Sequence, residues 1–427
     1  MTLARQVVRA LRATGAVPPR VAEAAKLHFA DALGVALAAA ASSVGKPYLR
    51  VAEEMGDAPA TQAMVLGGLI HSLEFDDTHT ASIAHGSSVV AAAALAAGQA
   101  AEASGAALLG AYARGWEVLI RFGLASPGRF QARGFQVTSV GGTLAAALVC
   151  GEILQLNEDQ AVAAMGISLS QASGVLEFLT NGSSVKSLHP GWAAHAGLVA
   201  AMLAKGGMTG PETALEGRFG FFRQFAGDES ASLAFSESLK TIGETWHLPD
   251  AAFKFYPCCH YLHPFIEAAG KLKSRGGEIL CRVPAGAAGV ICEPWDAKQS
   301  PPTPHAARWS LPVAVAARIV EGKVDLDTFE RPLSSSVLSL AKRISWEPLP
   351  DARFPERFEA EIVSGGETVR IDDVYGNPAT RPASAEAVRA KFDANGGSAA
   401  LWDAIQAARP AREIGMKLNT GREATVT

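Results

Sequence analysis

Side chains that could do chemistry are concentrated in three short stretches of a chain otherwise rich in Ala, Gly, Leu and Val. The first, HSLEFDDTHTASIAHGSS at 71–88, holds three histidines and three acids in eighteen positions. The others are GSSVKSLHPGWAAH at 182–195 and KFYPCCHYLHP at 254–264. Each places Lys or His beside Gly, Pro or Ser, where a loop at a helix edge can direct side chains into a cleft. The pattern predicts one site assembled from three distant segments.

These side chains suit proton transfer next to a carboxylate. Lys186 and Lys254 can hold a carboxylate and stabilise the charge that develops when a proton leaves the carbon α to it. Imidazole titrates near physiological pH, so His85 or His260 can move that proton. Dehydration, decarboxylation and epimerisation of a small polycarboxylate all fit this set, and none of them requires a cofactor.

Common metal motifs do not match the sequence. A DDxxD magnesium site needs an acid at its fifth position, but in the stretch that begins with the Asp pair at 76–77 this position is Thr80. No HExxH motif occurs, and the histidines of the first stretch lack a regular zinc-ligand spacing. The adjacent cysteines at 258–259 are too few for an iron–sulfur cluster. We therefore expect no metal and no organic cofactor.

The elements that position these stretches are predicted to be mostly helices. To about residue 265, apolar residues recur at three- and four-residue spacing between Gly, Pro and Asn breaks. Asn157 and Gln160 have the spacing of a capping box, which predicts a helix start there.

After residue 265 the pattern changes. CRVPAGAAGVIC at 281–292 and RFEAEIVSGGETVRIDDV at 357–374 are strand-like, and the second is predicted to form a hairpin at its Gly-Gly pair. Helical patterns lie between them. We predict a mainly α fold, with a large all-helical domain at 1–265 plus 394–427 and a smaller α+β lid domain at 266–393.

Composition favours a compact cytoplasmic protein. Hydrophobic residues make up 48% of the chain and charged residues 19%, which excludes disorder. The formal net charge is −4 and long Lys/Arg runs are missing, so we expect no nucleic-acid partner. The N-terminus lacks an apolar signal core, and long uncharged runs such as 134–151 contain Gln, Thr, Ser and Gly, so we expect no membrane association. Five cysteines without a paired framework fit a reducing compartment.

Together with RWSLPVAVA at 308–316 and the late hairpin, the three stretches resemble the MmgE/PrpD family, which includes 2-methylcitrate dehydratase, cis-aconitate decarboxylase and iminodisuccinate epimerase. EFDDTHTASIAHGSS is similar to the family's DFDDTH…HPS pattern, and VKSLHPGWAAHAG to its VKRLHPGKAAHSG pattern. The resemblance covers nearly the whole chain. It implies a helical main domain with an α+β lid, a pocket between them, a homodimer and no cofactor.

The resemblance also implies site residues. Glu74 stands where the family often has a pocket Asp, while Thr78, His85, Lys186 and Lys254 keep the family's residues.

Two pocket histidines of the family are replaced in this chain. Gln136 stands in place of one, and the other falls on or beside Cys259, with His260 one place on. His85 is followed by Gly86 rather than Pro. These replacements indicate a substrate other than methylcitrate or cis-aconitate.

We therefore expect a cofactor-independent, dehydratase-like lyase that acts at the carbon α to a carboxylate of a small di- or tricarboxylate. The expected catalytic residues are His85, Lys186, Lys254, Thr78, Glu74 and His260. The expected substrate-binding residues are Asp77, His79, Gln136, Cys259 and His263. The alternatives are an epimerase of an iminodisuccinate-like dicarboxylate and a catalytically silent carboxylate-binding protein.

Overall fold

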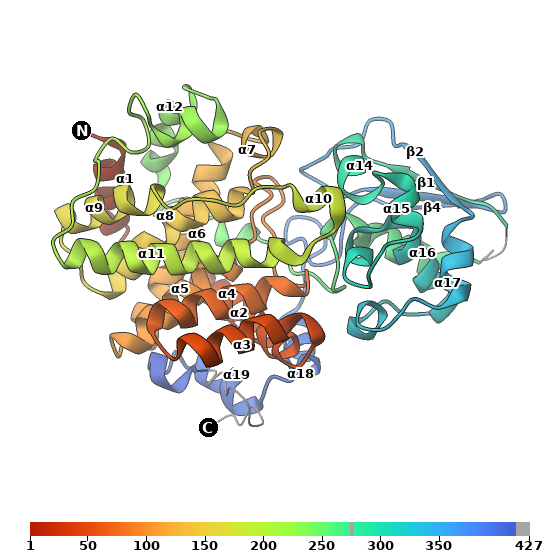
Figure 1. Ribbon diagram of the computed structural model, residues 1–427, viewed down its shortest axis with the longest axis horizontal. Coiled ribbons are helices and arrows are strands. Elements are labelled where there is room, and N and C mark those ends of the chain that lie inside the picture. Colours follow the sequence, from red (N-terminus) through yellow and green to blue (C-terminus); the bar gives the residue numbers. More distant parts are fainter. Residues whose placement is uncertain (274–276, 416–427) are drawn as a thin grey trace.

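The computed structural model describes residues 1–273 and 277–415. The fold is mainly α with a smaller α+β part, which confirms the predicted class (Figure 1). The larger part contains α1 (Leu3–Ala13), α2 (Pro19–Ala40), α3 (Lys46–Met55), α4 (Pro59–Ser72), α5 (Gly86–Ala100), α6 (Gly105–Leu124), α7 (Arg129–Ala132), α8 (Val137–Ile153), α9 (Glu158–Leu169), α10 (Phe178–Asn181), α11 (Leu188–Lys205), α12 (Ala231–Ser238), α18 (Ala385–Ala394) and α19 (Ala399–Gln406). The predicted capping box opens α9, because the side chains of Asn157 and Gln160 each accept from the other's backbone N–H.

Helix α11 crosses the larger part of the molecule and packs against α4, α5, α8 and α9 (Figure 1). Glycines allow α4 and α11 to touch. A Cβ at Gly191 would lie 2.3 Å from the carbonyl oxygen of Met64, and one at Gly67 would lie 2.8 Å from Gly191 Cα. This close crossing brings the end of α4 and the start of α11 together, so the first two chemistry-bearing stretches become neighbours.

The smaller part contains α13 (His263–Lys271), β1 (Ile279–Val283), α14 (Ala285–Ile291), α15 (Trp295–Gln299), α16 (Leu311–Glu321), α17 (Ser335–Ala341), β2 (Ile344–Pro348), β3 (Ala360–Ser364) and β4 (Glu367–Ile371). Its sheet has the order β2-β1-β3-β4, with β1 parallel to β2 and antiparallel to β3. Helix α13 packs against β3 and β4.

The predicted hairpin is confirmed as β3 and β4. Gly365 and Gly366 have φ of 56° and 82°, and a tight two-residue turn with both φ positive is favoured by glycine. The strand-like prediction for 281–292 is right only at its start, because Ala285–Ile291 is helix α14. Pro284 cannot donate to a strand ladder and ends β1, and the following alanines favour a helix.

Two separate hydrophobic cores accompany these parts. One is built from residues between Leu3 and Ala251 together with residues of the C-terminal helices, and the other from residues between Cys258 and Ile371. Helix α18 packs on α2 and gives Phe392 to the first core, although most of this helix falls within the predicted lid. The predicted domain borders stay a prediction, and residues 416–427, assigned to the helical domain, lie outside the described residues.

Within the described ranges no single helix is long and apolar enough to cross a membrane. One pair, Pro19–Ala40 with Ser43–Met55, meets the length and composition test jointly, across a bend of 92°.

Candidate active site

The three chemistry-bearing stretches meet at a cavity of about 300 Å³ between the helical and the α+β parts. A cavity of this size is typical of small-molecule sites. The predicted site residues that line it are Glu74, Thr78, His85, Gln136, Lys186, Lys254, Cys259 and His260. The other lining residues are Ile83, Gln131, Val137, Leu176, Phe178, Leu179, Tyr261, Gly286, Val290, Trp309 and Phe354.

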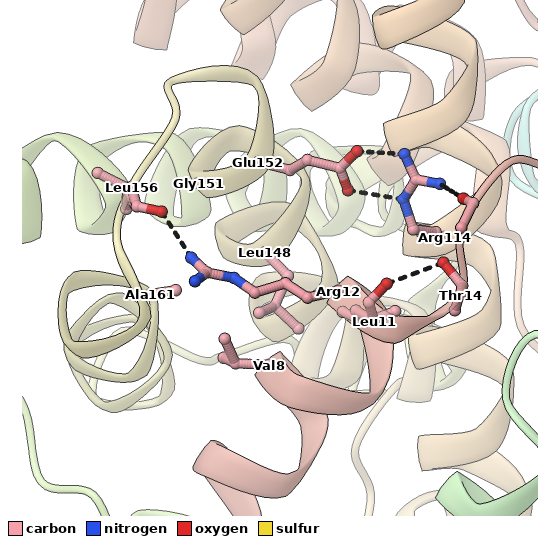
Figure 2. Close-up of a pocket in the computed structure, with 11 residues that line it drawn as sticks. Val8, Leu11, Arg12, Thr14, Arg114, Leu148, Gly151, Glu152, Leu156 and Ala161 are labelled. Carbon is pink, nitrogen blue, oxygen red and sulfur yellow. Dashed lines mark hydrogen bonds and ion pairs between the residues drawn. The ribbon is translucent and has the colours of Figure 1, made fainter.

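A second cavity of about 300 Å³ lies among α1, α6, α8 and α9 (Figure 2). Its two arginines are engaged by the protein itself. Arg12 donates to the Leu156 carbonyl over 2.7 Å, and Arg114 forms an ion pair with Glu152. None of the described residues that line it is His, Lys or Cys. The titratable groups therefore single out the first cavity as the candidate active site.

Glu74 lies between the two site lysines. Lys186 Nζ forms an ion pair with Glu74 Oε1, and Lys254 Nζ lies 3.8 Å from Glu74 Oε2 and donates to the Glu74 carbonyl over 3.2 Å. Burial alone would raise the pKa of Glu74, but Lys186 and Lys254 outweigh it and lower the pKa to about 2. The Glu74 carboxylate is therefore ionised at neutral pH.

The backbone of Glu74 is itself unusual. Its φ of 53° lies in the left-handed region, which costs a residue other than glycine about 1 to 2 kcal/mol. Such strain is typically found at functional sites, where surrounding contacts hold it in place. One such contact comes from α18, where Lys391 Nζ donates to the carbonyl of Phe75 over 2.8 Å and lies 2.8 Å from Asp31 Oδ1. The C-terminal part of the chain therefore anchors the loop that carries Glu74.

His85 is held as a neutral imidazole. Its Nδ1 lies 2.9 Å from the Asp77 carbonyl oxygen and 3.1 Å from Thr78 Oγ1. Because a carbonyl oxygen can only accept, Nδ1 carries the proton and Nε2 keeps its lone pair. Burial lowers the pKa of His85 well below its usual value, and the Lys254 ammonium group adds to this. His85 therefore offers a basic nitrogen at neutral pH.

Sequence reasoning gave no role to His71 and Asp76, although both belong to the first stretch. His71 Nδ1 lies 2.8 Å from Asp76 Oδ2, and Gln136 Nε2 lies 3.3 Å from His71 Nε2. The Gln136 carbonyl oxygen in turn lies 2.6 Å from His189 Nδ1. Burial would raise the pKa of Asp76, but the hydrogen bond with His71 and the nearby Lys254 ammonium group keep it well below its usual range. This buried chain fixes the orientation of the Gln136 amide at the cavity.

His71, Asp76 and His85 each bring one potential metal-ligand atom within 4.8 Å of the others. Lys254 Nζ lies 3.9 Å from Asp76 Oδ1, so an ammonium group already supplies the positive charge next to this carboxylate. A divalent cation between the three side chains would be repelled by that ammonium group. That the site uses no metal stays a prediction.

Three predicted substrate-binding residues do not line the cavity. Asp77 is buried and accepts from His28 Nδ1 over 2.9 Å, while its carbonyl orients His85 as described above. His79 is buried and hydrogen-bonds within its own loop. The ring of His263 packs edge-on against that of His260, with centroids 4.6 Å apart. These side chains support the residues that do line the cavity.

His260 lines the cavity with both ring nitrogens free of protein partners. Its side chain is 3% exposed, and neither nitrogen has a hydrogen-bond partner among the described residues. Burial lowers the pKa of His260 well below its usual value, so the ring is neutral. Because buried polar atoms in native proteins are normally paired, this arrangement points to a hydrogen bond with a ligand.

The chain was also compared with known proteins. The family model of the MmgE/PrpD N-terminal domain matches residues 3–234, and that of the MmgE/PrpD C-terminal domain matches residues 256–407. The chain belongs to the MmgE/PrpD family. This membership confirms the resemblance drawn from the five sequence motifs.

Among the relatives of this MmgE/PrpD protein are enzymes named cis-aconitate decarboxylase. The one from Aspergillus terreus is 27% identical over 410 residues, which cover 86% of this chain and 81% of that protein. The human one is 27% identical over 392 residues, which cover 85% of this chain and 76% of that protein. The mouse one is 28% identical over 379 residues, which cover 82% and 74%.

Proposed function

We propose that this MmgE/PrpD protein is a cofactor-independent, dehydratase-like lyase that acts at the carbon α to a carboxylate of a small polycarboxylate. The observation that carries the proposal is that a neutral imidazole and two buried ammonium groups line one cavity, those of His85, Lys186 and Lys254. That its relatives are named cis-aconitate decarboxylase supports a lyase acting on a small polycarboxylate.

In this mechanism Lys186 and Lys254, while still in contact with Glu74, bind the substrate carboxylates. The nearby ammonium charge lowers the energy of the dianionic intermediate that forms when the α-proton is lost. His85 Nε2 accepts this proton, because its Nδ1 is held by the Asp77 carbonyl and Nε2 carries the lone pair. The protonated His85 then returns the proton to the leaving hydroxyl group, so water departs and a double bond forms.

Glu74, Thr78, Gln136, Cys259 and His260 complete the proposed site. Glu74 positions both lysines, and Thr78 holds the ring of His85. Asp77, His79 and His263 act from behind the lining residues, as positioning residues and without touching substrate.

A second candidate function is epimerisation of a small dicarboxylate. It is favoured by one observation, that two neutral imidazoles, His85 and His260, line the same cavity. An epimerase with two such groups removes the α-proton with one and returns a proton to the opposite face with the other.

Proton NMR in deuterated buffer distinguishes these functions. We would incubate the protein with a panel of 2- and 3-hydroxy di- and tricarboxylates and follow the α-proton and the vinyl region. A lyase produces new vinyl signals, whereas an epimerase exchanges the α-proton and yields a diastereomer. A protein that shifts its melting temperature with these acids but neither exchanges nor converts any of them is a silent binder, and the proposal of a catalytic function is then wrong.

Two further expectations about this protein remain proposals. The family resemblance implies a homodimer, which sedimentation equilibrium would test. We also propose a cytoplasmic location, which fractionation of the source cells would test.

A further inference from the structure

The polar end of the cavity is close to electroneutral. Among the described residues, the cationic side chains that line it are Lys186 and Lys254, and both face the ionised carboxylate of Glu74. Lys254 also faces Asp76 at 3.9 Å. None of the described residues that line the cavity is an arginine, and its two histidines are neutral. Two ammonium groups therefore stand against the carboxylates of Glu74 and Asp76 before any substrate enters. The next cations outward, Arg308 and Lys391, pair with Glu330 and Asp31.

This balance limits how many carboxylates a substrate can bring. Each unpaired charge moved from water into a buried site is costly unless an opposite charge meets it. A tricarboxylate would place three negative charges beside a cluster whose ammonium groups already have partners. A dicarboxylate can share the two ammonium groups with Glu74, so it suits the charge balance better.

Another part of the cavity lining is an apolar wall, formed by Leu176, Phe178, Leu179, Val290, Trp309 and Phe354. The wall adjoins the polar end at Trp309, whose ring centroid lies 5.6 Å from Lys186 Nζ. The wall combines α10 and the residues just before it with α14, the short 3₁₀ turn Ala306–Trp309 before α16, and the loop before β3. Such a surface would not bind a third carboxylate, because it carries no charge and its only side-chain hydrogen-bond donor is the Trp309 indole N–H. It would instead take an alkyl or aryl group out of water.

A smaller cavity of about 150 Å³ lies behind part of the wall. Phe178, Leu179 and Trp309 line both cavities, and the other residues that line the smaller one include Pro294, Pro301 and Pro302. Lys298, which also lines the smaller cavity, already donates to the Val290 carbonyl over 2.6 Å. The three shared side chains are therefore not backed by packed protein, and a substituent longer than a methyl can displace them into this space.

Resting on the proposed function, we infer that the substrate is a dicarboxylate with an apolar substituent, its carboxylates at Lys186 and Lys254 and its substituent against the apolar wall. His260, with both nitrogens unpartnered, lines the same cavity and can bond a further polar group of the substrate. The structure thus assigns the two ends of the cavity to two different parts of one molecule.

Isothermal titration of the full-length protein with a graded set of acids tests this inference. The set is succinate, methylsuccinate, butylsuccinate, hexylsuccinate and propane-1,2,3-tricarboxylate. The dissociation constant should fall by about fourfold for each methylene that the wall buries. The tricarboxylate should bind more weakly than butylsuccinate. A dissociation constant that does not change with chain length, or tighter binding of the tricarboxylate, would overturn the inference while leaving the proposed function in place.

Three variants separate the two ends of the cavity. Leu179→Asn should make the dissociation constant depend less on the length of the alkyl chain. Leu233→Asn, at a 66% exposed position on α12, is the matched control and should keep the dependence of the native protein. Lys254→Met should weaken every acid in the set. The proposed function fails together with the inference if none of the acids binds the native protein. It also fails if Lys254→Met binds the acids with the same dissociation constants as the native protein and has the same melting temperature. If Leu179→Asn keeps the full dependence on chain length, only the inference fails.

Discussion

Replacing Glu74 by Gln tests the central electrostatic feature of the site. The change removes the negative charge that neutralises Lys186 and Lys254, and it keeps nearly the same volume. The pKa of Glu74 is lowered from 4.5 to about 2, and each unit corresponds to about 1.4 kcal/mol, so the ionised carboxylate stabilises the fold by about 3 kcal/mol. Loss of one partner from a buried ion pair typically costs about 3 to 5 kcal/mol, which agrees with this figure.

Urea unfolding followed by tryptophan fluorescence would measure the free energy of unfolding of the native protein and of Glu74→Gln, and so the difference between the two. Because the pKa of Glu74 is depressed in the folded state, its contribution is complete above pH 4.5 and is lost as the pH falls toward 2. The difference in free energy of unfolding between the native protein and Glu74→Gln should therefore be constant from pH 8 to 5. It should shrink as the pH falls below 5. Glu237→Gln, which removes one partner of the exposed Lys240 pair, is the matched control and should cost less than about 1 kcal/mol.

Two results would refute this reasoning. In one, Glu74→Gln is as stable as Glu237→Gln at pH 7, which would mean that the two lysines gain little from Glu74. In the other, the difference already declines between pH 7 and 6, which would mean that the titrating group is not a carboxylate with a depressed pKa.

The other predictions concern turnover. His85→Ala should abolish turnover with a melting temperature within a few degrees of native, and a large drop in melting temperature with activity retained would make His85 structural. Because burial holds the pKa of His85 well below 6.5, kcat/KM should show no inflection as the pH falls through 6.5, and one there would contradict a neutral His85. Lys186→Met and Lys254→Met should each lower kcat/KM by an amount that corresponds to about 1.5 to 3 kcal/mol of transition-state stabilisation. The double variant should lose less than the sum of the two single losses, and strictly additive losses would argue against a shared carboxylate. Turnover should survive exhaustive EDTA, and loss restored by one divalent metal would show that the site uses one.

The sequence pointed to most of the polar side chains that line the candidate cavity and to none of the apolar ones that form its wall. Lys186, Lys254 and His85 stand out because charged and titratable residues are scarce in this chain, and the fold brings them to one cavity. Phe178 and Trp309 have no such signal, because an apolar residue that lines a cavity has the same residue type as one in the core. Only the packing of the helical part against the α+β part shows which apolar residues line the cavity and which are in the core.

Within the first stretch, sequence could not tell which side chains face the cavity. Glu74 and Thr78 line it, whereas Asp76 and Asp77 are turned into the surrounding protein. A helix or a strand would give a period from which to read this, but the loop contains the left-handed residues Glu74 and Ile83 and follows no period. The hairpin at 360–371 was predictable for the opposite reason, because its turn type requires its two glycines.

The bond from Lys391 to the Phe75 carbonyl has a consequence for biosynthesis. Proteins are made from the N-terminus, and their N-terminal parts fold first. The strained loop at Glu74 is synthesised early, yet the ammonium group that anchors it arrives 316 positions later, on α18. A ribosome-bound chain can therefore pack α4, α5 and α11, and bring Lys186 and Lys254 to Glu74, while the Glu74 loop still lacks its contact with Lys391. A nascent chain halted before α18 should show a folded helical core whose Glu74 loop is cut by protease faster than in the 427-residue chain.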